Sequence, residues 1–547
     1  MQRTHLWIGG GLLFVTMIMA QTPTVGLLYS DTTRAWPGYT LFAPKASHFT
    51  YLIDNDGNLV HRWESAYAAG ASAYFLENGT LLRAAKVPAG NQSGGFQVLD
   101  WDGTVLWEFA YGAQHHDIEP LPNGHVILVA NDRKTAAEAL AAGRRPELTG
   151  GTVRSLKLVE VAPTDSGSAI VWEWKAWDHL IQDTDSLKPN YGVVRDHPER
   201  IDVNFAYDAS DDWLHPNSVD YNPDLDQLLV SNRGIHEVWV IDHSTTTEEA
   251  ASSSGGLYGH GGDLLYRWGN PASYGAGDST DQVFFGQHNA EWIPPGVPGE
   301  GHMLVFNNGF GRPDGAYSTV DEWIPPLDSA GTYGSALTAP YGPDSLVWRY
   351  QDTEGDTFYS PRFSSAQRLP NGNTLICSGA DGRFLEVTPS GEIVWEYINP
   401  VTPDGPVAQG DSVYQNDVYR VDRIPLDHPG LAGHDLTPQG PIELYLSVAG
   451  EGGGPESYSL AAPYPNPFNP TTTIRFAVPY RGPVQITIYS LLGEEIATLQ
   501  SGSVSPGWHT VSWNGKNSRQ QPVPTGLYLI RLSSRETTLS RRVLLLK

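Results

Sequence analysis

The sequence predicts an all-β protein, a six-bladed β-propeller followed by a small antiparallel β-sandwich. A unit of about four short strands recurs about six times, near residues 50–85, 96–130, 156–232, 236–309, 319–383 and 384–425. The composition, with 58 Gly, 41 Pro and 11% aromatic residues, suits short strands and tight turns rather than long helices. Four-stranded units that repeat in this way pack face to face as blades around an axis.

Each repeat closes on a tryptophan at the end of an apolar strand, in contexts such as DNDGNLVHRWE and TPSGEIVWEY. These tryptophans are Trp63, Trp107, Trp172, Trp268, Trp348 and Trp395. A large ring at this position fills the wedge between adjacent sheets. The loops at 131–155, 175–212, 244–284 and 310–345 are long, and such loops commonly shape a binding surface at the mouth of a channel.

The first 20 residues, MQRTHLWIGGGLLFVTMIMA, predict a secretory signal peptide. Arg3 is the basic flank, an apolar segment of moderate length follows, and the small residue Ala20 precedes Gln21. No other segment approaches the ~20 consecutive apolar residues that a bilayer crossing needs. We therefore expect no transmembrane segment and a propeller over residues 21–448.

The charge balance limits the partners of the protein. Its net charge is -27, from 61 acidic and 34 basic residues, which argues against nucleic acid or an anionic membrane as the partner. The single cysteine, Cys377, excludes an internal disulfide and lies in the apolar segment NTLICSG. A buried, inert thiol is the expectation there.

Three repeats carry a histidine at one shared position. His116 lies eight residues before Gly124, and His288 lies eight residues before Gly296. His215 lies nine residues before the aspartate that replaces glycine in its own turn. Equivalent positions in a ring of blades converge on the axis, so we expect the three imidazoles to meet at one funnel mouth.

Three interpretations of these histidines are open. They are structural residues, or a three-histidine site for zinc or copper, or a site that recognises an anion and moves a proton. No local spacing such as His-x-His supports a metal site, so no metal or other cofactor is expected. Asn217 and Asn289, close after two of the histidines, are candidates for binding a substrate.

Anion recognition also needs a fixed cation. Arg312, in FNNGFGRPDG after the strand that follows His288, is the nearest candidate. Its planar guanidinium suits sulfate or phosphate oxygens, and the glycines beside it allow close approach of the backbone to a ligand. The alternative is an ordinary loop arginine.

The segments DWLHPNSV, GQHNAEW, NNGFGR and the repeated LPNG resemble the bacterial aryl-sulfate sulfotransferases over most of residues 35–425. The resemblance implies a six-bladed propeller that transfers sulfuryl groups from an aryl sulfate to a phenol acceptor without a nucleotide donor. In that family one histidine attacks the sulfur and becomes sulfated, while two histidines and an arginine support it. His215, His288 and Arg312 match the supporting residues.

The expected nucleophile is missing from its place in the pattern. In FYSPRFSSAQRLPNGNTLICSGADGRFLEV, Arg383 stands where the family has histidine, and a protonated guanidinium cannot attack sulfur. Either His116 supplies the nucleophile, or the chain performs other chemistry, or it only binds. Arg383 is then a candidate for binding the substrate. The alternative function is a noncatalytic secreted propeller that binds a polymer or protein partner.

After the propeller we expect a linker at 449–460 and the sandwich at 461–547. The tail resembles the C-terminal sorting domain of type IX secretion substrates, with YPNPFNP, a turn at 491–493, Trp513 in WNG and Tyr528 in GLY. The resemblance implies the type IX secretion machinery as a partner, export across the outer membrane, and release or surface attachment. An immunoglobulin-like accessory module is the alternative.

Overall fold

The computed structural model describes most of the chain. The described residues are 23–444 and 457–546, apart from 46, 91, 166, 207–209, 335–338, 353–357, 462, 464–465 and 536. The signal peptide expected at 1–20 and most of the linker expected at 449–460 therefore lie outside the described residues. The chain divides into two compact units, Met1–Leu444 and Tyr445–Lys547. With 46% strand and 5% helix, the all-β class is confirmed.

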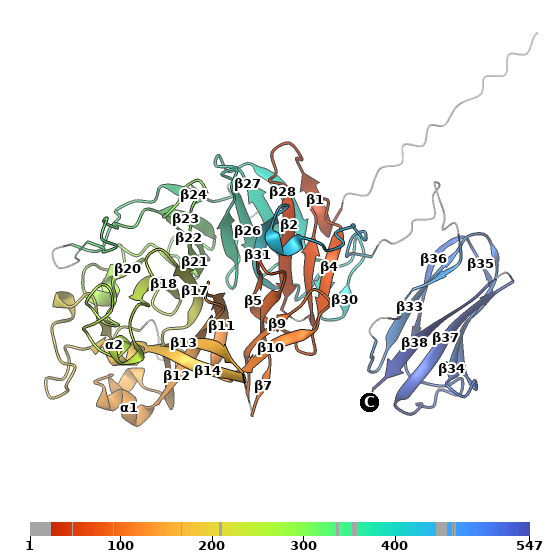
Figure 1. Ribbon diagram of the computed structural model, residues 1–547, viewed down its shortest axis with the longest axis horizontal. Coiled ribbons are helices and arrows are strands. Elements are labelled where there is room, and N and C mark those ends of the chain that lie inside the picture. Colours follow the sequence, from red (N-terminus) through yellow and green to blue (C-terminus); the bar gives the residue numbers. More distant parts are fainter. Residues whose placement is uncertain are drawn as a thin grey trace, which may run out of the picture. The chain divides into compact units, whose positions relative to one another are not determined.

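Six antiparallel sheets of four or five strands make up the first unit (Figure 1). The first contains β31 (Val418–Pro425), β2 (Gly38–Pro44), β3 (Phe49–Ile53) and β4 (Leu59–Glu64). The second contains β5 (Ala69–Phe75), β6 (Leu81–Ala85), β9 (Gly95–Leu99) and β10 (Val105–Ala110). The third contains β11 (Gln114–Pro120), β12 (Val126–Thr135), β13 (Thr152–Thr164) and β14 (Gly167–Lys175).

The remaining three sheets follow in chain order. The fourth contains β17 (Pro216–Asn222), β18 (Gln227–Asn232), β19 (Glu237–Asp242) and β20 (Tyr266–Trp268). The fifth contains β21 (His288–Trp292), β22 (Met303–Asn307), β23 (Thr319–Trp323) and β24 (Trp348–Tyr350). The sixth contains β25 (Ser365–Arg368), β26 (Thr374–Ser378), β27 (Arg383–Val387), β28 (Ile393–Ile398) and β1 (Gly26–Ser30).

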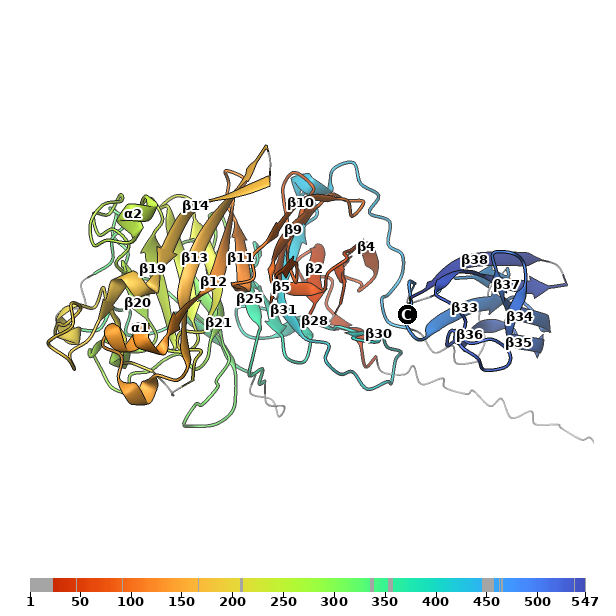
Figure 2. The same ribbon diagram turned by 90° about the horizontal axis from the view of Figure 1, so that it is seen from below.

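One strand of each sheet faces its counterparts in the other sheets. These innermost strands are β5, β11, β17, β21, β25 and β31, and they lie toward the middle of the unit (Figures 1 and 2). Each contacts the next in this order, and β31 contacts β5 again. The six strands therefore form a closed ring, and their inward side chains share one interior.

The two ends of the first unit complete sheets that the middle of the chain begins. β31 pairs with β2, with Thr40 opposite Arg423, and β1 pairs with β28, with Ser30 opposite Trp395. Each of these pairings joins segments more than 360 residues apart in sequence, by the residue numbers. The ring is therefore closed by hydrogen bonds between its N-terminal and C-terminal segments.

The tryptophans pack between sheets, as the repeat predicts for most of them. Trp63, Trp172, Trp268 and Trp395 are buried, and Trp268 of the fourth sheet stacks on Trp323 of the fifth with 4.8 Å between ring centroids. Trp107 and Trp348 are only partly buried. Cys377 is a free, buried thiol, in agreement with its apolar surroundings.

The first unit also contains short helices and pairs of short strands that are not part of the six sheets. The helices are α1 (Ala136–Ala141), α2 (Thr247–Ala250) and 3-10 turns at Pro146–Leu148, Ala176–His179, Val194–Asp196, Pro271–Tyr274 and Pro429–Leu431. The short strand pairs are β7 (Pro88–Ala89) with β8 (Gln92–Ser93), β15 (Leu180–Ile181) with β16 (Ile201–Asp202), and β29 (Val401–Thr402) with β30 (Gly405–Pro406). Within the described ranges, no helix is both long and apolar enough to span a membrane.

The second unit has two sheets with a common apolar core. One sheet contains β32 (Ser459–Leu460), β33 (Thr472–Val478) and β36 (Gly507–Trp513). The other contains β35 (Glu495–Val504), β34 (Gly482–Ser490), β37 (Gly526–Ser534) and β38 (Thr538–Leu545). Ile474 and Trp513 of the first sheet are buried in one cluster with Ile486 and Ile530 of the second, so the unit is a sandwich.

Candidate functional site

A backbone irregularity recurs where the innermost strands begin. Strand register shifts between Ala69 and Ala73, Gln114 and Ile118, Pro216 and Ser218, and His288 and Glu291. Such bulges bend a strand and redirect a side chain. His116, His215 and Asn289 have φ of 59°, 43° and 50°, in the left-handed region that non-glycine residues rarely adopt. The bulged segments of β11, β17 and β21 thus aim their side chains into the ring.

Four imidazoles lie together inside the ring, and we call them the imidazole cluster. The ring centroid of His116 is 5.1 Å from that of His215 and 6.2 Å from that of His288. His115, which sequence reasoning missed, joins them at 4.1 Å from His116 and 5.3 Å from His215. His288 is buried, while the other three are partly exposed. The three expected histidines are therefore neighbours, and the cluster keeps access to solvent.

Tyr419 of β31 lies against the cluster from across the ring. Its ring centroid is 5.8 Å from that of His116 and 6.3 Å from that of His288. Its hydroxyl donates a hydrogen bond to the backbone carbonyl of Asn217 on β17. Since β31 and β17 are three strands apart in a ring of six, this side chain crosses the interior and forms a floor beneath the imidazoles.

The hydrogen bond of His215 fixes where its proton lies. Its Nδ1 is 2.6 Å from Oδ2 of Asp212, and a carboxylate can only accept. Burial alone would raise the pKa of Asp212, but the hydrogen bond from His215 and its charge hold that pKa below the ordinary value. In the neutral ring Nδ1 therefore carries the proton, and Nε2 has a lone pair for a ligand.

His288 is held in the same tautomer by different groups. Its Nδ1 lies 2.8 Å from Oδ1 of Asn308 and 3.2 Å from the carbonyl of Gly286. The amide nitrogen of Asn308 donates to the carbonyls of Ser360 and Phe363, so its Oδ1 is the acceptor. Burial lowers the pKa of His288 to about 3, and its Nε2 therefore also has a lone pair.

The contact between His115 and His116 determines which nitrogen of each ring carries the proton. Nδ1 of His115 is 3.0 Å from the carbonyl of Pro216 and 3.0 Å from Nδ1 of His116. Since a carbonyl only accepts, His115 carries its proton on Nδ1, and Nδ1 of His116 accepts. Burial lowers the pKa of His115 to about 4 and that of His116 well below 6.5. The neutral His116 ring thus presents an Nε2–H donor.

Arg233 lies beside the cluster, and Arg154 lies behind it, 3.5 Å from Asp212. The backbone N–H of Arg233 donates to the carbonyl of His215 at 3.2 Å, and its guanidinium lies over the ring of Phe310 at 4.9 Å. Its positive charge contributes, after burial, to the lowered pKa of His288. Among the described residues, no hydrogen bond or ion pair engages its guanidinium, which leaves this cation available to an anionic ligand.

Arg312 has its contacts elsewhere. Its guanidinium donates to Oγ1 of Thr319 at 3.1 Å and lies over the rings of Phe285 at 5.0 Å and Tyr317 at 4.6 Å. Within the part of the chain that the structure describes, no contact joins Arg312 to the imidazole cluster. Its Nε is buried without a partner.

The other sequence candidates differ in their surroundings. Arg383, at the start of β27 and not on an innermost strand, forms an ion pair with Glu396 at 2.7 Å. Asn217 donates from its side chain to the carbonyl of Gln287 at 2.7 Å. Asn289 donates to Oε2 of Glu291 at 3.2 Å. Oδ1 of both asparagines is buried without a hydrogen-bond partner.

In the sixth sheet a hydroxyl replaces the imidazole. Ser364 lies eight residues before Gly372, the same spacing as in the histidine repeats, and its φ is 88°. Its Oγ donates to Oγ of Ser360 and accepts from the backbone N–H of Gly379, both at 2.9 Å. In this sheet the position that carries histidine in the other repeats is therefore held by a buried serine whose hydroxyl has hydrogen-bond partners.

A charged network crosses the ring farther along the same strands. Arg420 of β31 donates to the hydroxyl of Tyr74 at 2.7 Å and to Asp422 at 3.1 Å, and lies 3.8 Å from Glu291. The hydroxyl of Tyr74 in turn donates to Glu119 at 2.8 Å. We call these groups, with Asp117 and Asp220, the axial carboxyl network.

Most carboxyl groups of this network hold protons more firmly than usual. Burial raises the pKa of Asp117 and of Asp220 to about 6, and that of Glu291 to about 8. The positive charge of Arg420 opposes this rise in each case. The network therefore contains protonated carboxyl groups near neutral pH.

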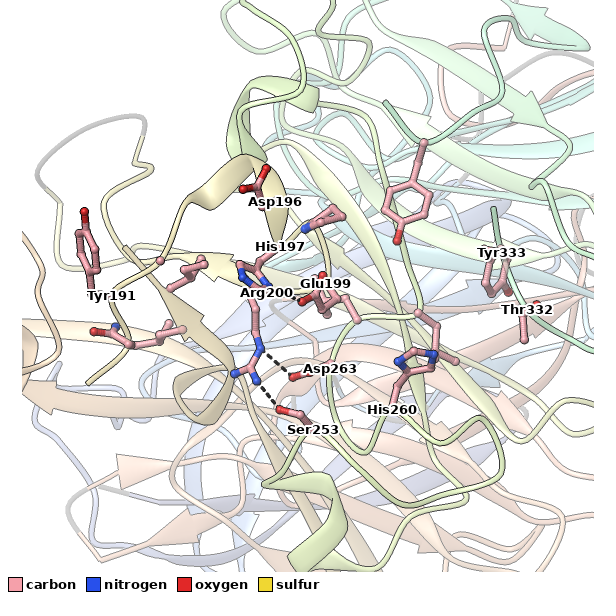
Figure 3. A pocket seen from close by; sticks show the side chains of 18 of the residues that line it. Tyr191, Asp196, His197, Glu199, Arg200, Ser253, His260, Asp263, Thr332 and Tyr333 are labelled. Carbon is pink, nitrogen blue, oxygen red and sulfur yellow. Dashed lines mark hydrogen bonds and ion pairs between the residues drawn. The ribbon is translucent and has the colours of Figure 1, made fainter. Parts of the chain in front are cut away.

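A separate hollow of about 730 Å³ lies among the loops of the first unit. Figure 3 shows Arg200 between Asp263, at 3.2 Å, and the hydroxyl of Ser253. Tyr191 and His260 are among its other lining residues. None of the four imidazoles lines this hollow, so it is distinct from the imidazole cluster.

Two of the missed residues had a signal in the sequence. His115 directly precedes His116, and a pair of histidines places two imidazoles at one bulge. Asn232-Arg233-Gly234 ends β18 as Asn307-Asn308-Gly309 ends β22, so Arg233 occupies the position of the asparagine that holds His288. Comparing the turns after the second strands would have identified Arg233.

Two family models match the chain. One, described as arylsulfotransferase (ASST), matches residues 30–404, which is more than half of the chain. The other, described as an FlgD Ig-like domain, matches residues 473–538. A search of curated proteins finds no match.

Solved structures show only distant similarity. A protein of unknown function from Bacteroides caccae is 12% identical over 66% of this chain and 93% of that chain, with a TM-score of 0.36. Kuenenia stuttgartiensis hydrazine synthase is 14% identical over 53% and 68%, with a TM-score of 0.30. A streptogramin B lyase is 9% identical over 74% and 93%, with a TM-score of 0.33. At these TM-scores the similarity carries no argument about this chain.

Proposed function

Because this chain belongs to the arylsulfotransferase family, we propose that its imidazole cluster transfers a sulfuryl group from an aryl sulfate to a phenol without a nucleotide donor. The observation that carries this proposal is the complementary set of ring nitrogens in one place. His215 and His288 offer lone pairs, His116 offers an N–H donor, and Arg233 offers a guanidinium that no described residue engages in a hydrogen bond or ion pair. An anionic ester needs all three kinds of partner.

In the first step Nε2 of His215 attacks the sulfur. An N–S bond forms, the bond between sulfur and the aryl oxygen breaks, and the phenolate leaves and takes a proton from water. Asp212 keeps the proton of His215 on Nδ1 and stabilises the positive charge that develops on the ring. Arg233 and Nε2–H of His116 stabilise the sulfuryl oxygens.

In the second step a phenol acceptor attacks the sulfated His215. Nε2 of His288 accepts the phenol proton, the bond between oxygen and sulfur forms, and the N–S bond breaks to restore His215. His116 was one candidate for the attack in the sequence, but its Nδ1 is engaged by His115 and its Nε2 carries the proton. The hydrogen bonds therefore favour His215 over His116 as the nucleophile.

We also propose that the six sheets are the six blades of one propeller and that the second unit acts as a type IX sorting domain. The closed ring of innermost strands supports the first proposal. YPNPFNP and the order of the later motifs support the second, and imply a protein released from the cell or attached to its surface. Deletion of residues 461–547 should retain the protein inside the cell, as fractionation of cultures would measure.

The transfer reaction is tested by incubating the purified chain with a chromogenic aryl sulfate and a phenol acceptor. We expect continuous release of the coloured phenol together with formation of the sulfated acceptor. In His288→Ala we expect loss of the sulfated acceptor and of phenol release beyond one phenol per chain. No donor-dependent transfer, with ligand binding also unchanged in His288→Ala, would contradict the proposal and favour a noncatalytic propeller that binds a polymer or protein.

A further inference from the structure

We propose that His115, His116 and His215 form a binding site for a divalent zinc ion. One ring nitrogen of each residue lies within 4.8 Å of those of the other two. Zinc holds imidazole nitrogens at about 2.0–2.1 Å in a tetrahedron, so modest rotations of the three rings bring the nitrogens to the ion. Three histidines leave the fourth position of the tetrahedron open.

The hydrogen bonds behind two of the rings have the arrangement that metal-binding histidines require. A histidine that binds a metal through one nitrogen donates its other N–H to a carboxylate or backbone carbonyl, which fixes the ring. Nδ1 of His215 donates to Asp212 at 2.6 Å, and Nδ1 of His115 donates to the carbonyl of Pro216 at 3.0 Å. Both rings therefore present Nε2 with its lone pair.

The contact between the adjacent rings is a hydrogen bond when no ion is bound. Nδ1 of His115 and Nδ1 of His116 are 3.0 Å apart, and the proton on His115 serves both this contact and the carbonyl of Pro216. Binding of zinc by His116 therefore requires its ring to turn away from Nδ1 of His115, whose N–H keeps the carbonyl of Pro216 as its partner.

The three residues also have a negative neighbour and access from solvent. Asp212, which also lies 3.5 Å from Arg154, supplies a carboxylate directly behind His215. His115, His116 and His215 are all partly exposed, which leaves a path for the ion.

This inference does not rest on the proposed function, because zinc binding needs no sulfate donor. The two are linked in one respect, since Nε2 of His215 would bind the ion and also attack the sulfur. We therefore expect zinc to inhibit sulfuryl transfer in competition with the aryl sulfate, and excess chelator to restore the reaction.

The test is titration of the full, untagged protein with Zn²⁺ in a calorimeter, without a donor. We expect one strong site per chain that is lost in His115→Gln, and that is weakened about 10- to 100-fold in Asp212→Asn because the ring of His215 loses its anchor. His260→Gln is the matched control, because His260 is exposed at the separate hollow, and its affinity should equal that of the parent.

A second measurement separates loss of the site from loss of folding. Co²⁺ should give the intense visible bands of a tetrahedral ion in the parent and in His260→Gln, but not in His115→Gln. Circular dichroism should show the same strand content in all three. Weak binding with equal affinity in every folded variant, or octahedral Co²⁺ spectra throughout, would overturn the proposal and indicate only surface histidines.

Discussion

The third, fourth and fifth sheets differ from the sixth sheet in chemistry, although all four have a left-handed residue at the innermost strand. His116 of β11, His215 beside β17 and Asn289 of β21 have φ of 59°, 43° and 50°, and Ser364 beside β25 has φ of 88°. Of these four sheets, only the third, fourth and fifth present imidazoles to the interior of the ring. The left-handed residue is thus a feature of the repeat, whereas the reactive groups come from the side chains of three particular sheets.

The order of the strands in the ring explains why the imidazoles meet. β11, β17 and β21 are neighbours, so their histidines gather on one side of the interior. β31 contributes Tyr419 as the floor from the opposite side. Backbone strain at an innermost strand therefore does not identify the site, and the side chains on neighbouring strands do.

The largest loss of activity should follow removal of the imidazole of His215, for which the sixth sheet has no counterpart. We expect His215→Ala to lower kcat/KM for aryl sulfate by at least about 10³-fold, because the attacking nitrogen is removed. Ser364→Ala is the matched change in the sixth sheet. It should cost about 1–3 kcal/mol of stability through the lost partners of Ser360 and Gly379 and leave transfer nearly unchanged. Equal losses of activity would contradict the comparison.

The second-largest loss of activity should follow replacement of Arg233, and Arg312 is the matched comparison. Each follows the second strand of a sheet with a histidine, but only Arg233 lies beside the cluster. We expect Arg233→Gln to lower kcat by about 10²–10³-fold, the size seen when one donor to a developing anion is removed. Arg312→Gln should lower it less. Steady-state kinetics on both variants decide this, and the opposite ranking would restore Arg312 as the functional cation.

A pH effect should distinguish β21 from β25. Glu291 of β21 lies three residues after His288, and its counterpart three residues after Ser364 is the uncharged Gln367. Burial raises the pKa of Glu291 from 4.5 to about 8. Its contribution to the free energy of unfolding is therefore fully present below pH 4.5 and is lost as the pH rises through about 8.

Glu291→Gln makes β21 resemble β25 and cannot ionise. We expect urea unfolding of this variant to show a smaller decline of the free energy of unfolding between pH 4.5 and 8 than in the parent. Gln367→Ala serves as the control and should keep the decline of the parent. An unchanged decline in Glu291→Gln would mean that this carboxyl group does not hold its proton in the folded state.

The smallest loss of activity should follow removal of the hydroxyl group of Tyr419. Tyr419→Phe keeps the ring against His116 but leaves the carbonyl of Asn217 without its donor. We expect a loss of about 1–3 kcal/mol in the free energy of unfolding and a change of less than about tenfold in kcat/KM. Thermal unfolding measures the first quantity. A loss of activity as large as that of His215→Ala would make Tyr419 a catalytic group.

The sequence predicted the all-β class, the repeated sheets and the three imidazoles, because turn glycines fix the distance to each bulge. It could not predict that β31 pairs with β2, since that pairing joins segments far apart in the chain. It also could not place the arginines. The orientation of Arg312 depends on the rings of Phe285 and Tyr317, and the pairing of Arg383 depends on Glu396 in the next strand.

Sulfation of His215 is the step that most directly distinguishes the proposed mechanism. The test is to mix the chain with a chromogenic aryl sulfate in the absence of acceptor and to follow both phenol release and the intact mass at neutral pH. We predict a burst of one phenol per chain and a peptide containing His215 that has gained one sulfuryl group. A sulfuryl group on a peptide containing His115 and His116 instead, or transfer without any covalent intermediate, would contradict it.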